Sequence, residues 1–184
     1  DFCARNDLVA VVVLGRPYTL YNPSLNSNVP AILREQGAMG IPTDCFPVPA
    51  DLPVFRDMYW SQGQRILRAA HWIRRSPGVY GIYCTNYSCG PDSFNLHFFG
   101  YIMSGRPFSI IETDGHSGDA GTRTRVEAFL HCVGQDHRLG TGKEAANDLR
   151  TVQSKSLHMS DLRKDRSLVL IPWMGPSSDV VAAL

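Results

Sequence analysis

The run Val9-Ala-Val-Val-Val-Leu14 decides the fold class of this chain. It is continuous, rich in β-branched residues and free of apolar–polar alternation, which is typical of a strand covered on both faces in a parallel sheet. We therefore expect a central strand here. A helix over residues 31–36 should follow, because Asn28 suits an N-cap, Pro30 suits a first turn and Gly37 suits a helix end.

Strands and helices alternate along the chain beyond this first unit. Apolar patterning predicts strands over residues 39–48, 79–84 and 107–111, and helices over residues 58–75, 94–104 and 119–133. Such alternation predicts a mainly parallel sheet with right-handed crossovers and helices on both faces. We therefore expect an α/β domain over residues 8–133, flavodoxin-like or Rossmann-like in layout.

The composition changes after the last of these helices. Residues 134–166 are polar and carry mixed charges and glycine, which predicts a linker that is partly helical, around residues 144–152. Residues 167–172 again have a strand pattern, and a helix pattern follows them. We expect residues 167–184 to be the start of a second, truncated α/β unit, and the chain to be a piece of a longer protein.

Charge and apolar content limit the partners that we expect. The formal net charge is +1 over 184 residues, and no dense basic run suggests contact with a nucleic-acid backbone. No apolar stretch reaches the roughly 18–20 residues that a membrane helix needs. The five cysteines are an odd number in a chain long enough to fold without disulfides, which favours a reducing compartment. We therefore expect a cytoplasmic protein that binds neither nucleic acid nor a membrane.

Cysteines follow two of the predicted strands, where parallel sheets bind ligands. Cys84 and Cys89 flank the loop after the third strand, and Cys45 follows the second strand. Three thiolates from these two loops would suit an iron–sulfur cluster or a zinc ion that lacks one protein ligand, and spacing does not distinguish the two. The alternative is that these cysteines fill the core, because free cysteine is among the most buried residue types.

A dense polar cluster follows the fourth strand and enters a helix. Asp114, His116 and Asp119 are candidates for carrying protons, and Thr122 and Arg125 near the helix start are candidates for holding an anion. The alternative is structural, with Asp119 as an N-cap and Arg125 on the helix surface.

The loop after the first strand lacks the Gly-x-Gly-x-x-Gly pattern of a dinucleotide site. Arg16 and Tyr18 in this loop are nevertheless candidates for lining a pocket, with Arg16 facing a carboxylate or phosphate. The alternative is that Tyr18 and Tyr21 cover the edge of the sheet.

Several segments together resemble a known family: Leu14-Gly-Arg-Pro-Tyr18, Asn28-Val-Pro30, Asn86-Tyr-Ser-Cys-Gly-Pro-Asp-Ser93, His116-Ser-Gly-Asp-Ala-Gly-Thr122 and Ile171-Pro-Trp-Met-Gly175. They resemble the large CoA-substrate-specific enzyme activase proteins, in the region similar to the D-component (beta-type) subunit of 2-hydroxyacyl-CoA (2-hydroxyglutaryl-CoA) dehydratases. The resemblance covers most of residues 8–184. Its most specific parts are the segments around Cys89 and His116.

This resemblance implies a multidomain protein of anaerobic metabolism. It implies that cysteines hold a [4Fe–4S] or double-cubane cluster and that ATP-driven, low-potential electron transfer starts a difficult reduction or dehydration. The cluster-binding role would fall on Cys89 and Cys84, with Cys45 as a third candidate. ATP would bind only an upstream module. The expected partners are other domains of the same longer protein or a homologous subunit, with an acyl-CoA as candidate substrate, and the fragment alone is expected to be inactive.

Two other functions stay open at this point. The chain can be a metal-free docking domain for an ATPase module or a partner subunit. It can also be an enzyme that uses Cys89 as a nucleophile with His116 as its base, which requires the two residues to lie on neighbouring strand ends.

Overall fold

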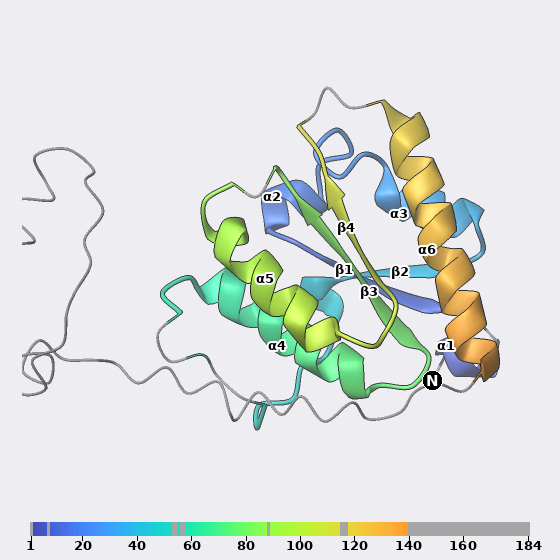
Figure 1. Cartoon of the computed structure of the whole chain (residues 1–184), viewed down its shortest axis with the longest axis horizontal. Coiled ribbons are helices and arrows are strands. Elements are labelled where there is room, and N and C mark those ends of the chain that lie inside the picture. Colours follow the sequence, from blue (N-terminus) through green and yellow to red (C-terminus); the bar gives the residue numbers. More distant parts are fainter. Residues whose placement is uncertain are drawn as a thin grey trace, which may run out of the picture. The chain divides into compact units, whose positions relative to one another are not determined.

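Four parallel strands form one sheet in the order β2-β1-β3-β4 (Figure 1). The strands are β1 (Ala10–Leu14), β2 (Met39–Pro42), β3 (Val79–Thr85) and β4 (Phe108–Glu112). Ala10 of β1 pairs with Met39 on one side and with Val79 on the other, so β1 has a parallel neighbour at each edge. This arrangement confirms the α/β fold class and the central position of the first strand.

The computed structural model describes residues 2–139 apart from residues 7, 53, 54, 56, 57, 88 and 115–117 and the side chains of Ala4 and Asp119. The chain divides into two units, residues 1–151 and 152–184. The expected second α/β unit over residues 167–184 and most of the expected linker lie outside the described residues. Everything below concerns the first unit.

Helices cover both faces of the sheet (Figure 1). The larger ones are α3 (Val29–Glu35), α4 (Ser61–Arg75), α5 (Pro91–Met103) and α6 (Asp119–Leu139). Short helical turns are α1 (Phe2–Arg5), α2 (Pro17–Leu20) and η1 (Thr43–Cys45). α3 and α6 lie on one face, and α4 and α5 lie on the other.

The alternation of side chains along β1 explains why both faces are apolar. Val11 and Val13 pack into the core under α3 and α6, whereas Val12 and Leu14 pack into the core under α4 and α5. All five residues of β1 are buried. A strand buried on both faces needs apolar residues at every position, which is why the run shows no alternation.

Several elements differ in extent from the sequence-based expectations. β2 ends at Pro42, short of residue 48, and the chain turns into η1, where the Thr43 hydroxyl donates to the Val13 carbonyl oxygen at 2.8 Å. α5 begins at Pro91 and not at residue 94, because proline suits the first helical position. α6 continues to Leu139, beyond the expected helix end at residue 133.

α3 begins at Val29, ahead of the predicted residue 31 and directly after Asn28, but Asn28 acts differently from a standard N-cap. Its backbone is left-handed, with φ of 57°, and its side chain makes no capping hydrogen bond. The preceding Ser27 also has a positive φ of 47°. The backbone turn, together with Pro30 in the first helical turn, therefore sets where α3 begins.

Candidate functional site

The strand order places a topological switch point between β1 and β3. The chain leaves β1 toward β2 on one side and later passes to β3 on the other, so the loops after β1 and β3 separate at the carboxyl edge of the sheet. Ligands of open α/β sheets bind in such a crevice. The start of the loop after β1 lies very close to the end of β3, since a Cβ atom on Gly15 would lie 2.8 Å from the Cys84 carbonyl oxygen. Glycine is therefore needed at this position.

A buried carboxylate organises the crevice. Asp92, in the first turn of α5, is only 1% exposed. It accepts hydrogen bonds from the Tyr83 hydroxyl at 3.0 Å, from the Thr85 hydroxyl at 2.7 Å and from Arg16 Nη2 at 3.2 Å. The last contact is an ion pair that joins the loop after β1 to α5.

The environment keeps Arg16 charged and Tyr83 neutral. Burial is the largest single influence on Arg16 and opposes its charged form. The Asp92 carboxylate, the hydrogen bond to Cys89 and smaller contributions together outweigh burial, so the pKa of Arg16 rises above its ordinary value. Burial, reinforced by the negative charge of Asp92, raises the pKa of Tyr83 well above its ordinary value. Asp92 is therefore paired with one cation and two neutral hydroxyl donors.

The same arginine holds the loop that carries Cys89. Arg16 Nη2 also donates to the Cys89 carbonyl oxygen at 3.3 Å. The Cys89 amide donates to the Asn86 carbonyl oxygen at 3.0 Å, and the Asn86 side chain accepts from the Thr19 hydroxyl at 2.9 Å. Gly90 then adopts a φ of 51° as the chain enters α5. Cys89 is exposed, so its thiol is accessible from solvent.

Cys84 lies only five positions earlier but faces a different environment. It is fully buried in the core beneath α3 and α6, among residues such as Val13 and Ile111. Burial raises the pKa of its thiol to about 12. Cys84 therefore lies in the core, whereas Cys89 lies at the surface.

Cys84 makes the stability of the domain sensitive to alkaline pH. Its thiol is neutral in the folded state until about pH 12, whereas an unfolded thiol ionises near its ordinary pKa of 9.0. Because the folded-state pKa is the higher one, this contribution is complete below pH 9 and is lost between pH 9 and pH 12. We expect a loss of about 1.4 kcal/mol per pH unit from this group. Urea unfolding at several pH values measures this loss of stability. In the Cys84→Ala variant the free energy of unfolding should decrease less between pH 9 and pH 12.

Cys45 lies at the carboxyl end of β2, at the end of η1, and is exposed. Among the residues that the structure describes, no three His, Cys, Asp or Glu side chains come together as a metal-binding group. The three cysteines proposed from sequence are thus divided, with Cys45 and Cys89 accessible and Cys84 in the core.

The remaining candidates have separate positions. The Tyr18 ring lies against the Arg16 guanidinium, 4.7 Å from Cζ to the ring centroid, as expected for two residues lining one crevice. Thr122 is buried in α6, and Arg125 and Asp114 are exposed. His116 and the side chain of Asp119 lie outside the described residues, so their proposed roles with Asp114 remain predictions.

The principal residue that sequence reasoning missed is Asp92. A signal was available, because an aspartate in the first turn of a helix after a parallel strand lies at the carboxyl edge of the sheet. Its partner Arg16 was identified as an anion-binding residue, and the anion it binds in this structure is the Asp92 carboxylate.

None of the helices in the described part of the chain is both long and apolar enough to cross a membrane. Comparison with protein families, curated proteins and solved structures found no match to this chain.

Proposed function

We propose that this chain is an iron–sulfur-binding module of a protein related to 2-hydroxyacyl-CoA dehydratases and CoA enzyme activases. The observation that carries the proposal is the exposed Cys89, fixed at the topological switch point by Arg16 and by the start of α5. A cysteine thiolate is the usual ligand of such clusters, and a bound cluster supplies one-electron transfer at low potential. The proposed location is the cytoplasm, and the proposed partners are other domains of the same protein or a homologous subunit.

The described cysteines fit part of a cluster site. Cys89 and Cys45 both lie beyond the carboxyl edge of the sheet and are exposed, but they follow β3 and β2, which have β1 between them. Cys84 is enclosed in the core. The proposal therefore assigns Cys89 as the main ligand and Cys45 as the second. Further ligands have to come from residues of this chain outside the described part.

The residues around Cys89 have two roles in this proposal. Arg16 and Asn86 hold the backbone on both sides of the thiol, which fixes the direction in which Cys89 points. Arg16 also places a positive charge on this side of the crevice. Asp92 keeps Arg16 in place and is a positioning residue.

Iron and acid-labile sulfide content after oxygen-free reconstitution tests the proposal. We expect the wild-type chain to take up iron and sulfide, and Cys89→Ser to lose most of both. Cys132→Ser, which changes an exposed cysteine on α6, is the matched control and should retain them. Cys84→Ala should also retain the cluster, because its thiol is enclosed. Absence of iron from a folded wild-type chain, or equal loss in Cys132→Ser, would contradict the proposal.

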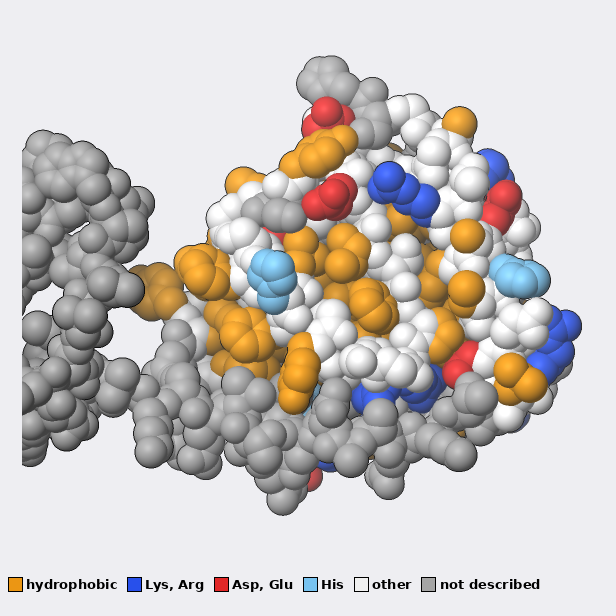
Figure 2. All heavy atoms as spheres, viewed as in Figure 1, with side chains coloured by type: hydrophobic (Ala, Val, Ile, Leu, Met, Phe, Trp, Pro, Cys, Tyr) orange, Lys and Arg blue, Asp and Glu red, His pale blue; other side chains and the backbone are white. Residues whose placement is uncertain are grey.

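A metal-free docking domain is the second candidate, and one surface favours it. Aromatic side chains are exposed around α5 and before α4, as the apolar groups in Figure 2 show: Tyr59 at 91%, Phe94 at 58%, Tyr101 at 44% and Trp60 at 37%. The Trp60 and Phe94 rings lie 5.7 Å apart. Aromatic residues of this kind are enriched in protein interfaces. This candidate would be supported if the iron-free chain binds the ATPase module and the Phe94→Ser variant binds it more weakly.

A further inference from the structure

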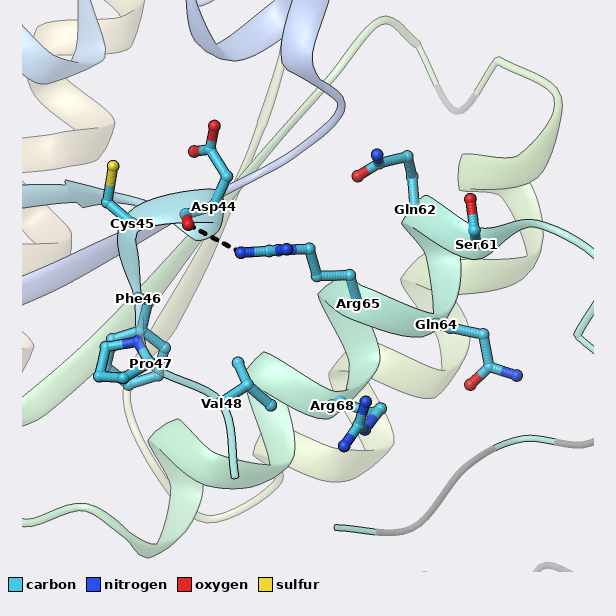
Figure 3. A pocket seen from close by; sticks show the side chains of 10 residues that line it. All are labelled: Asp44, Cys45, Phe46, Pro47, Val48, Ser61, Gln62, Gln64, Arg65 and Arg68. Atoms are coloured by element: carbon cyan, nitrogen blue, oxygen red, sulfur yellow. Dashed lines mark hydrogen bonds between the residues drawn. The ribbon is translucent and has the colours of Figure 1, made fainter. Parts of the chain in front are cut away.

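A pocket of about 510 Å³ lies between the chain that follows β2 and the first half of α4 (Figure 3). One wall is apolar and comes from Phe46, Pro47 and Val48. The opposite wall is polar and comes from one face of α4: Ser61, Gln62, Gln64, Arg65 and Arg68. The pocket thus combines an apolar surface with two guanidinium groups.

Neither arginine is neutralised by a carboxylate among the described residues. Arg65 Nη2 donates to the Asp44 carbonyl oxygen at 2.7 Å, and Arg68 Nη2 donates to the carbonyl oxygens of Pro49 at 2.8 Å and Ala50 at 3.1 Å. These acceptors are uncharged. The ion pairs found in the described part of the chain involve other residues, Arg16 with Asp92 and Arg123 with Glu35.

Arg68 also has an unused hydrogen-bond donor. Its Nε atom is buried and has no hydrogen-bond partner among the described residues. A buried N–H group without an acceptor is costly, and the cost is greater for a charged group. The Arg68 guanidinium therefore carries its charge with an incomplete set of hydrogen bonds from the described residues.

Among the described residues that line the pocket, Asp44 carries the one carboxylate, and it is directed elsewhere. The Asp44 carboxylate accepts a hydrogen bond from the Tyr21 hydroxyl at 2.6 Å, and in Figure 3 it points away from the Arg65 guanidinium. Arg65 contacts only the backbone oxygen of this residue. The charges of Arg65 and Arg68 therefore remain open to a ligand.

We propose that this pocket binds a small organic anion, a carboxylate or phosphate monoester that carries an apolar group. Arg65 and Arg68 bind the oxyanion, because guanidinium groups match the geometry of carboxylate and phosphate oxygens. Phe46 and Val48 pack against the apolar part. Cys45 also lines this pocket, but the interactions proposed here come from the two arginines and the apolar wall and need no cluster.

Titration of the full chain with phenyl phosphate and with benzoate tests this proposal, followed by calorimetry or by amide chemical shifts. We expect saturable binding of one or both probes, weakened about tenfold or more in Arg65→Gln. The matched control is Arg75→Gln, which changes an exposed arginine on the same helix and should leave the affinity unchanged. Benzyl alcohol, which lacks the anion, should not bind. The two probes distinguish a phosphate ligand from a carboxylate ligand.

A second variant separates binding from folding. Val48→Asp places a negative charge on the apolar wall without removing either arginine, and it should abolish binding while the circular dichroism spectrum stays native. Absence of saturable binding of both probes up to about 10 mM would overturn the proposal. Equal affinities of wild type, Arg65→Gln and Val48→Asp would overturn it as well.

Discussion

Replacing Asp92 by alanine is expected to lower the free energy of unfolding by about 3 kcal/mol. The substitution removes the acceptor of the Tyr83 and Thr85 hydroxyl groups and the counter-ion of Arg16. The Tyr83 and Thr85 hydroxyl groups and the Arg16 guanidinium would then remain wholly or largely buried without the carboxylate. Urea denaturation measures the effect. The urea concentration at the unfolding midpoint should fall, while the dependence of the free energy of unfolding on urea concentration stays unchanged.

Two further variants identify the cause of this loss. Asp51→Ala removes an exposed carboxylate and should change the stability by less than about 0.5 kcal/mol. Asp92→Asn keeps the size and one acceptor oxygen but not the charge, so it should cost less than Asp92→Ala. A loss below about 1 kcal/mol in Asp92→Ala would show that the network is much weaker than its geometry indicates.

Replacing Phe99 by alanine is expected to cost about 3–5 kcal/mol, the usual range for removing a buried aromatic ring. Phe99 is 0% exposed and lies edge-on to Tyr83, with ring centroids 5.4 Å apart, and to Phe108 at 5.3 Å. The substitution leaves a cavity between α5 and the sheet. Chemical denaturation followed by circular dichroism measures the loss.

Phe94→Ala is the matched control for this prediction, because it removes the same ring from the exposed face of the same helix. Phe94 is largely exposed, and its substitution should cost less than about 1 kcal/mol. Similar losses in the two variants would contradict the assignment of the buried face of α5. A large loss of partner binding in Phe94→Ala, with little loss of stability, would instead support the docking surface.

The sequence predicted the fold class because the decisive signal is local. The run from Val9 to Leu14 has to be apolar at every position in order to be covered from both sides, and this requirement is visible without any tertiary information. Element ends were less well predicted. Val133 is the last buried residue of α6, and the polar residues that follow it continue the helix toward solvent, where polarity does not distinguish a helix from a loop.

The candidate site was predicted in position but only in part in its chemistry. The loops after β1 and β3 do meet, as the parallel layout requires. Which way each cysteine points depends on its register within or beyond β3. Cys84 lies inside the strand and faces the core, whereas Cys89 lies past the strand end. The pairing of Arg16 with Asp92 joins residues far apart in sequence, and no local pattern marks it.

The position of β1 between β2 and β3 also sets the order in which the sheet can be completed. A ribosome produces β1 and β2 first, but the other edge of β1 has no partner until α4 and then β3 have been made. Pairing across so long a stretch of chain is slow, and an unpaired apolar strand edge can associate with other chains meanwhile. The strand β1, which lies within the run that defines the fold, is therefore also an aggregation hazard during synthesis. Fragments that end before Val79 lack β3. One edge of β1 should therefore stay unpaired in them, and they should remain prone to aggregation.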